Sequence, residues 1–216
     1  MTKAIVKLRS RLNGSVKIEL KAEKPFEKVK VVIQKDGNTL FSNDYIIIPT
    51  DFFVGDFRIE NPSIWSLSDP ELYEYRVEKE ELCGRFGFRE IGQNGKNITI
   101  NGKPVYIRGY IRGAKAHDHA NLLGLSLKDF YLKNLKEAKK FGFNYVRFHS
   151  VVPEEEMFEA ADEVGMLVHV ELRPPHDIYN NLEEMVTTGS AIVPEEFLKE
   201  TVDKCFNHPS FAVYCI

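Results

Sequence analysis

The first part of the chain, up to about residue 89, alternates between hydrophobic and polar positions with a period of two. The alternation is clear in residues 16–20, 29–33 and 73–78. Turn-forming residues separate the alternating runs: Asn13-Gly14, Asp36-Gly37-Asn38, Pro49-Thr50-Asp51 and Ser68-Asp69-Pro70. This pattern predicts short antiparallel strands, each with one face in a core. We therefore expect residues 1–90 to form an immunoglobulin-like β-sandwich.

The period changes after residue 95. The pair Asn101-Gly102 lies between two short apolar runs and predicts a tight hairpin. Residues 127–140 carry leucines and aromatics three and four positions apart, with Ser126 as N-cap and Gly142 beyond the end, which predicts a helix. The same reasoning predicts the remaining elements: strands at 144–149, 166–172 and 211–216, and helices at 153–163 and 194–206.

Strands that alternate with helices over short connections predict parallel βα units. With a first strand at 106–109, the chain from Val105 onward supplies about four strands and three helices. A complete (β/α)8 barrel needs roughly 250 residues. We therefore expect the first half of a TIM barrel, truncated at its fourth strand. A doubly wound sheet is the structural alternative, although no glycine-rich turn follows any of the strands.

Composition narrows the class of protein. The net charge is −3 over 216 residues and both signs are mixed along the chain, so no stretch is basic enough to favour nucleic acid or an anionic membrane. No apolar run resembles a signal peptide or a membrane span. The three cysteines are an odd count without motif spacing, which favours free thiols in a reducing compartment. We expect a cytoplasmic protein.

Several motifs in a fixed order carry a family resemblance. Residues 86–91 and 98–109, with 61–66 and 70–73 upstream and 142–150, 161–168 and 207–210 downstream, resemble family 2 glycoside hydrolases. That family includes β-galactosidases, β-glucuronidases and β-mannosidases. The resemblance implies a sandwich followed by a TIM barrel. It also implies a carbohydrate substrate, cleavage of β-glycosidic bonds with retention, and no organic cofactor.

A retaining glycosidase uses two carboxyl groups about 5 Å apart, one as acid and base and the other as nucleophile. The resemblance places the acid in a Gly-Asn-Glu motif directly after Ile216 and the nucleophile further downstream. Neither group is therefore assigned to a residue of this chain, which we expect to be an internal fragment that is inactive alone. The exposed edge of half a barrel also predicts partly ordered loops or self-association.

Three residues near the strand ends are candidates for the sugar site. Arg147 and His149 alternate with apolar residues, so both lie on one face of their strand, which in a barrel can face the lumen. An arginine there can keep a carboxylate ionised, and the resemblance implies this role and contacts with sugar hydroxyls. A structural ion pair and a core histidine are the alternatives. Glu171 could accept a sugar hydroxyl, anchor a loop, or pair with Arg147 or Arg173.

The segment after the first barrel strand departs from the family pattern, which has an Asn-Arg-His-Glu type run. Arg112 is retained and is a further candidate for supporting the site, but Gly113 and Ala114 stand at the His and Glu positions. Asp118, within His117-Asp118-His119, is our candidate for a sugar contact. The alternative is a mobile surface loop.

Two other functions remain open. The His117-x-His119 pair suggests a metal-dependent hydrolase, for which His149, His169, Glu171 and His176 are conceivable further ligands. A metal site needs three or more convergent ligands, and the P-C-x-x-C motif of zinc deaminases is absent, so we predict no metal. A non-catalytic carbohydrate-binding or interaction module is the second alternative.

Two groups of residues have a structural and a functional reading. Trp65, with Tyr73 and Tyr75, could form a platform for stacking sugars, but a core plug at one end of the sandwich is the favoured interpretation. Asp162 and Glu163 match a family helix motif. We expect them to be solvated or capping residues.

Overall fold

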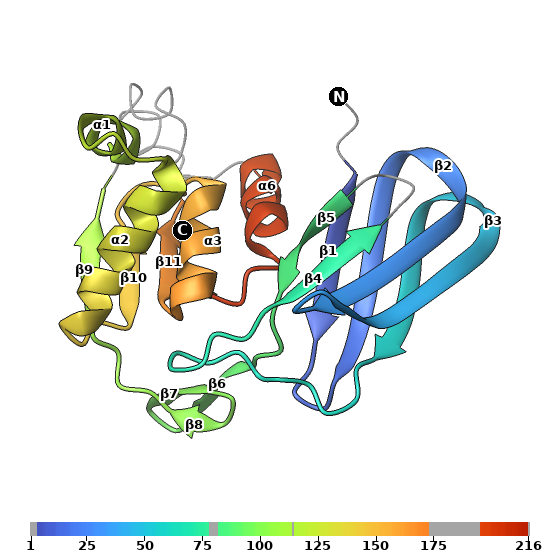
Figure 1. The fold of residues 1–216 in the computed structure, drawn as a ribbon, viewed down its shortest axis with the longest axis horizontal. Coiled ribbons are helices and arrows are strands. Elements are labelled where there is room, and N and C mark those ends of the chain that lie inside the picture. The colour runs from blue at the N-terminus through green and yellow to red at the C-terminus, as the bar shows by residue number, and fades with distance from the viewer. Residues whose placement is uncertain (1–3, 78–81, 114, 173–194, 216) are drawn as a thin grey trace, which may run out of the picture. The chain divides into compact units, whose positions relative to one another are not determined.

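The computed structural model describes residues 4–77, 82–113, 115–172 and 195–215. The chain forms two compact units. The first comprises Met1–Tyr106 with Phe206–Pro209, and the second comprises Ile107–Cys205 with Ser210–Ile216. Figure 1 shows antiparallel strands in the first unit and strands accompanied by helices in the second. The predicted fold class, a sandwich followed by TIM-barrel βα units, is confirmed.

Five antiparallel strands form the sandwich of the first unit. They are β1 (Ile5–Ser10), β2 (Ser15–Lys35), β3 (Asn38–Arg58), β4 (Tyr73–Val77) and β5 (Leu82–Phe86). β2 pairs with β1 over its first part, with β4 over its last part, and with β3 along most of its length. The two long strands therefore pass through both layers of the sandwich (Figure 1).

The length of β2 and β3 corrects two predictions. The turn predicted at Pro49-Thr50-Asp51 is wrong, because these residues lie within β3. Residues 16–20 and 29–33 form one strand rather than two. The β2–β3 register shifts between Lys21 and Lys28, and such bulges bend a strand. The chain thus changes layer at bulges rather than at a turn. Pro49 is tolerated because β3 pairs with β2 alone in the described sheet.

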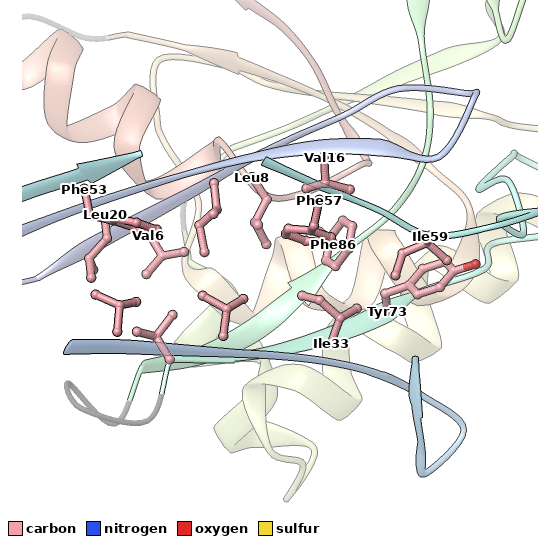
Figure 2. Packing of buried hydrophobic residues seen from close by; sticks show 14 of the residues in the cluster. Val6, Leu8, Val16, Leu20, Ile33, Phe53, Phe57, Ile59, Tyr73 and Phe86 are labelled. Atoms are coloured by element: carbon pink, nitrogen blue, oxygen red, sulfur yellow. The ribbon is translucent and has the colours of Figure 1, made fainter. Parts of the chain in front are cut away.

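The core of the sandwich follows the predicted alternation. Buried side chains of β1, β2 and β3, such as Leu8, Val16 and Phe57, point toward Tyr73 and Phe86 of β4 and β5 (Figure 2). Trp65 is completely buried, and its backbone N–H donates to the Phe88 carbonyl oxygen over 2.9 Å. The core-plug interpretation of this tryptophan is therefore confirmed, and the sugar-stacking alternative is wrong.

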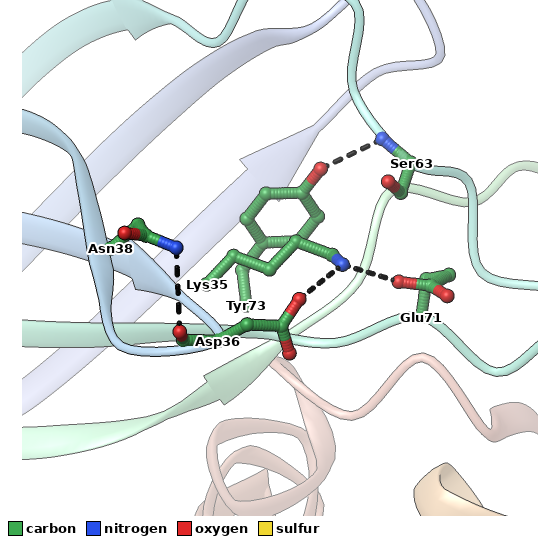
Figure 3. Close-up of polar contacts among 6 residues, drawn as sticks. All are labelled: Lys35, Asp36, Asn38, Ser63, Glu71 and Tyr73. Atoms are coloured by element: carbon green, nitrogen blue, oxygen red, sulfur yellow. Dashed lines mark hydrogen bonds and ion pairs between the residues drawn. The ribbon is translucent and has the colours of Figure 1, made fainter.

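Polar contacts hold the loop between β3 and β4 to the sandwich (Figure 3). The Tyr73 hydroxyl accepts a hydrogen bond from the Ser63 backbone N–H over 2.7 Å. Lys35 Nζ lies 2.6 Å from Glu71 and 2.9 Å from Asp36. Hydrogen bonds to these two carboxylates raise the pKa of Lys35 above its ordinary value. Asp36 lies in the turn between β2 and β3. In this turn the Asn38 side-chain amide donates to the Asp36 carbonyl oxygen over 3.4 Å.

A small sheet and a returning segment complete the first unit. The sheet consists of β6 (Ile91–Asn94), β7 (Asn97–Ile100) and β8 (Lys103–Pro104). Asn101 and Gly102 both have positive φ, 53° and 76°, as in a type I′ turn, so the predicted hairpin is confirmed. The returning segment is Phe206–Pro209, which belongs to the first unit. Within it, Asn207 Oδ1 accepts from the Leu8 N–H over 2.9 Å, and Asn207 Nδ2 donates to the Val6 carbonyl oxygen over 2.8 Å. It therefore pairs with β1 as a neighbouring strand would.

The second unit is built on four parallel strands in the order in which they follow along the chain. They are β9 (Gly109–Arg112), β10 (Tyr145–Phe148), β11 (Leu167–Glu171) and β12 (Phe211–Cys215). A doubly wound sheet reverses its strand order at a switch point, whereas this order is that of a barrel. The predicted parallel βα units are confirmed.

The first barrel strand begins three residues later than predicted. The strand is β9, at Gly109–Arg112, so Gly109 alone of the predicted residues 106–109 belongs to it. The preceding hairpin continues as far as Val105, whose N–H donates to the Ile98 carbonyl oxygen over 2.9 Å, and residues 105–108 belong to no strand. Tyr106 is consequently 79% exposed rather than part of a sheet core.

Four helices are described in the second unit: α1 (Ala116–Leu122), α2 (Leu127–Lys140), α3 (Glu155–Val164) and α6 (Glu195–Cys205). The predicted caps are confirmed, since Ser126 Oγ accepts from the Asp129 N–H over 3.0 Å and Gly165 ends α3 with a φ of 73°. Segment 116–122, expected in a loop, is helical. None of the described helices has both the length and the apolarity to span a membrane.

Asp162 of α3 corrects another prediction. Expected to be solvated or capping, it is buried, and its Oδ1 accepts from the Ser210 backbone N–H at the start of β12 over 2.9 Å. Its neighbour Glu163 is partly exposed and lies 2.9 Å from Lys128 Nζ. The cysteines are free thiols, with Cys205 buried and Cys83 exposed.

Candidate active site

The two faces of the parallel sheet differ in chemistry. Val146 and Phe148 of β10, with Val168 and Val170 of β11, are buried in the core that the helices share. Side chains alternate across a strand. Arg147, His169 and Glu171 therefore lie on the opposite face, at or near the C-terminal ends of two neighbouring strands. That end is where parallel βα folds carry their active sites.

Arg147 and Glu171 form an ion pair on this face. The Arg147 Nη2–Glu171 Oε2 distance is 2.8 Å, and both side chains are partly buried. The same Oε2 atom accepts a hydrogen bond from the Ser150 backbone N–H over 2.9 Å. This hydrogen bond, aided by the Arg147 charge, lowers the pKa of Glu171 below its usual value. Glu171 is therefore ionised at neutral pH. The ion pair is the alternative that the sequence left open for both residues.

His149 follows Arg147 at the end of β10 and is exposed. Its backbone N–H donates to the Arg112 carbonyl oxygen over 2.8 Å. The core-histidine alternative is thus wrong for His149. The next residue, Ser150, has a φ of 55°, in the left-handed region. This turn sets the direction in which the chain leaves the site.

A second polar pair lies beside the first. The Tyr145 hydroxyl is 2.6 Å from Nδ1 of His169. Burial and the nearby Arg147 charge lower the pKa of His169, so the imidazole is neutral near pH 7. Neither Tyr145 nor Ser150 was among the site residues expected from the sequence. Alternation along β10 places Tyr145 on the face of Arg147, but no local pattern signals the turn at Ser150.

Arg112 lies on the other face of the sheet. Its guanidinium is 5.3 Å from the centre of the Phe130 ring and 6.0 Å from that of Tyr131, both in α2. In register it pairs with Phe148, whose side chain is in the helix-facing core. The structure therefore does not bring the Arg112 side chain together with Arg147 and Glu171.

Asp118 and the flanking histidines lie in helix α1. Asp118 is exposed in the first turn. His117 Nε2 is 3.2 Å from Glu154 Oε1, and the Tyr131 hydroxyl donates to Glu154 Oε2 over 2.6 Å. These contacts connect α1, α2 and the beginning of α3. They engage the His117 ring in a contact with a carboxylate of the α3 N-cap.

The metal hypothesis receives no support from the geometry. Within the described ranges, no three His, Cys, Asp or Glu side chains converge as metal ligands. His176 and Arg173, which the sequence analysis considered as a ligand and an ion-pair partner, lie outside the described residues. The site instead contains a cationic guanidinium with an ionised carboxylate, beside a neutral histidine and a tyrosine.

Comparisons with known proteins identify the family. Residues 2–89 match the family model for glycosyl hydrolases family 2, and residues 91–215 match the model for the TIM barrel domain of that family. Among curated proteins, the chain is 28% identical over 195 residues to a putative β-glucuronidase from Formosa agariphila. It is 26% identical over 180 residues to a β-galactosidase from Kluyveromyces lactis.

The matches cover most of this chain but little of the relatives. The Formosa alignment covers 86% of this chain and 22% of that protein, and the Kluyveromyces alignment covers 74% and 17%. The chain thus spans about a fifth of the length of these relatives.

A solved structure with the same fold is the β-glucuronidase of Parabacteroides merdae, with a TM-score of 0.71 and 23% identity, covering 97% of this chain and 28% of that one. The two family models together account for nearly every residue, in the order that the motifs indicated. The chain belongs to family 2 of the glycosyl hydrolases.

Proposed function

We propose that a protein containing this chain hydrolyses terminal β-glycosidic bonds with retention of configuration, without an organic cofactor. Family membership and relatives named β-galactosidase and β-glucuronidase support this proposal. The observation that carries it within the structure is the Arg147–Glu171 pair at the C-terminal ends of β10 and β11. A cation fixed there is suited to a reaction that depends on an ionised nucleophilic carboxylate.

In this proposal Arg147 stabilises the nucleophile. A guanidinium has five N–H donors in a planar fork, and the hydrogen bond to Glu171 engages one nitrogen, Nη2. The remaining donors can hold a second carboxylate ionised by charge-assisted hydrogen bonds. The same interaction would stabilise that group when it leaves the anomeric carbon in the second step of the double displacement.

Glu171 is not suited to be the acid of this reaction. A general acid must be protonated at the working pH, and its pKa is normally raised for that purpose. The Ser150 N–H and the Arg147 charge instead lower the pKa of Glu171. We therefore do not assign the acid to Glu171. Following the family resemblance, we propose that both catalytic carboxyl groups come from other parts of a longer protein, and that the 216-residue chain is inactive alone.

The remaining candidates have supporting roles in the proposal. His149 and Asp118 are exposed at the same end of the unit and contact sugar hydroxyls. Arg112, at the end of β9, supports the end of the neighbouring strand β10, because its carbonyl oxygen accepts a hydrogen bond from the His149 N–H. We place the protein in the cytoplasm, where thiols such as the exposed Cys83 remain reduced.

The outer strands β9 and β12 have no further neighbour in the described sheet. Unpaired edges are prone to strand addition, and Ile111 of β9 is 65% exposed. We propose that the 216-residue chain self-associates through these edges when it is produced alone.

The activity is tested with nitrophenyl β-galactoside, β-glucuronide and β-mannoside, on the 216-residue chain and on the longest product of the gene. The long product should release nitrophenol from at least one substrate, and the chain should release none. Arg147→Ala in the long product should lower kcat/KM by at least ~100-fold. The control is Arg58→Ala, which removes an exposed arginine 3.4 Å from Glu60. No turnover by any long product would favour the carbohydrate-binding module instead.

A further inference from the structure

We propose that Glu171 is a positioning residue that holds Arg147 and the turn at Ser150 in one arrangement before any sugar binds, and that it does not itself contact the sugar. The inference rests on the proposed function for the role of Arg147, but its geometry stands without it. It resolves the three roles that the sequence left open for Glu171 in favour of a combined ion pair and loop anchor.

One carboxylate oxygen of Glu171 accepts from two donors. Glu171 Oε2 is 2.8 Å from Arg147 Nη2 and 2.9 Å from the Ser150 backbone nitrogen. Both contacts are charge-assisted hydrogen bonds of normal length. The guanidinium and the backbone amide are therefore held to the same point, and neither can move without breaking a contact to the carboxylate.

The backbone directly after β10 is bonded to the strands on both sides of it. The His149 N–H is bonded to β9 through the Arg112 carbonyl oxygen. The next N–H, that of Ser150, is bonded to β11 through Glu171. Ser150 has a φ of 55°, a left-handed conformation that residues other than glycine rarely adopt. Consecutive backbone amides thus fasten the end of β10 to the strand on each side. Glu171 offsets the unfavourable conformation.

The contacts of Glu171 fix the position of the Arg147 charge before substrate binds. An unrestrained arginine side chain samples many rotamers, and a site that fixes its charged group in advance avoids that cost when the reaction takes place. Residues that orient a catalytic group are as necessary as the group itself. Glu171 provides this orientation for Arg147 and, through the Ser150 turn, for the exposed His149 side chain.

Heteronuclear NMR of the 216-residue chain tests the geometry without any activity. The comparison includes the wild type, Glu171→Gln, Glu171→Ala and the control Glu137→Gln, which removes the charge of an exposed carboxylate 2.6 Å from Lys140. The Ser150 amide should exchange with solvent at least ~10-fold faster in Glu171→Ala than in the wild type. It should exchange at an intermediate rate in Glu171→Gln, which keeps an acceptor. The control should not change it.

A titration of His169 in the same samples reports the charges. Arg147 lowers the pKa of His169 and Glu171 raises it. Glu171→Gln should therefore lower the His169 pKa further, whereas Arg147→Met should raise it. A Ser150 amide that exchanges equally fast in the wild type and in Glu171→Ala would overturn the proposal, whatever the protein catalyses.

Kinetics of the longer gene product distinguish positioning from sugar contact. Glu171→Ala should lower kcat by at least ~10-fold and change KM by less than about threefold. Removing any one hydroxyl from the sugar should lower kcat/KM by the same factor in Glu171→Ala as in the wild type. If removal of one hydroxyl lowers kcat/KM in the wild type but not in Glu171→Ala, then Glu171 binds that hydroxyl, and the proposal is overturned. An inactive long product would refute the proposed function while the NMR experiment still decides the role of Glu171.

Discussion

Replacing Asp162 with alanine tests whether a buried carboxylate connects helix α3 to the last strand. The Asp162 side chain and the whole of Ser210 are buried, and Oδ1 accepts the Ser210 backbone N–H over 2.9 Å. Asp162→Ala removes the acceptor and leaves this N–H without the carboxylate in a site that water does not reach.

The size of the effect follows from that contact. A hydrogen bond to a charged group contributes about 1.5–3 kcal/mol, and an unsatisfied buried donor costs about 1–3 kcal/mol. We therefore expect Asp162→Ala to lower the free energy of unfolding of the second unit by about 2–3 kcal/mol. With an m-value of about 2 kcal/mol per molar urea, the midpoint should fall by roughly 1–1.5 M. Asp162→Asn keeps an acceptor and should lose less.

The chain offers a separate signal for each unit. The described helices α1, α2, α3 and α6 belong to the second unit, so far-ultraviolet circular dichroism at the helix band reports its unfolding. The one tryptophan of the sequence, Trp65, is buried in the first unit, so its fluorescence reports the other. Urea titrations of the wild type and Asp162→Ala should be recorded with both signals.

The neighbouring substitution Glu163→Ala is the matched control. Glu163 lies in the same helix but is partly exposed, 2.9 Å from Lys128, and its loss should change the free energy of unfolding by less than about 0.5 kcal/mol. This comparison holds whether the units unfold separately or together. An Asp162→Ala effect equal to that of Glu163→Ala would refute the reasoning.

Three further predictions concern pH, a turn and assembly. The pKa of His169 in the folded protein lies below 6.5, so the unfolded protein binds a proton more readily below that pH. The free energy of unfolding, followed by circular dichroism at the helix band, should therefore fall on acidification. An equal dependence of this free energy on pH in His169→Asn would contradict this. Gly14→Ala, whose Cβ would lie 2.0 Å from a backbone oxygen, should destabilise the first unit more than Gly37→Ala, which has open space, by Trp65 fluorescence; equal losses would contradict this. Light scattering should show that the 216-residue chain forms oligomers, and that Ile111→Lys on β9 converts them to monomers; a monomeric wild-type chain would contradict this.

Local patterns predicted the elements whose signals are complete within a few residues. Helix α2 begins after Ser126 and ends before Gly142 as expected, because cap, amphipathic period and terminator are all in the sequence. The alternation along 144–149 likewise placed Arg147 on the face opposite Val146 and Phe148, and a pair with Glu171 was one of the alternatives that the sequence left open. Neighbouring parallel strands bring these two side chains together.

The errors arise where distant contacts override a local signal. Residues Pro49-Thr50-Asp51 read as a turn, but pairing with β2 draws them into a strand. A more local contact accompanies the late start of the first barrel strand. Residues 106–109 read as that strand, but Val105 directly before them bonds to Ile98 of the preceding hairpin, and the strand starts only at Gly109. Asp162 looks like a surface carboxylate until the fold brings the Ser210 N–H to it. The partners of Thr50 and Asp162 are far away in the sequence, so no window of the chain reveals them.

The most direct test of the central claim is the configuration of the first sugar released by the longer gene product. Proton NMR distinguishes the two anomers before they interconvert. A retaining enzyme of the proposed kind releases the β-anomer first from a nitrophenyl β-glycoside, and the α-anomer appears later by mutarotation. Initial release of the α-anomer would contradict the double displacement that Arg147 is proposed to support.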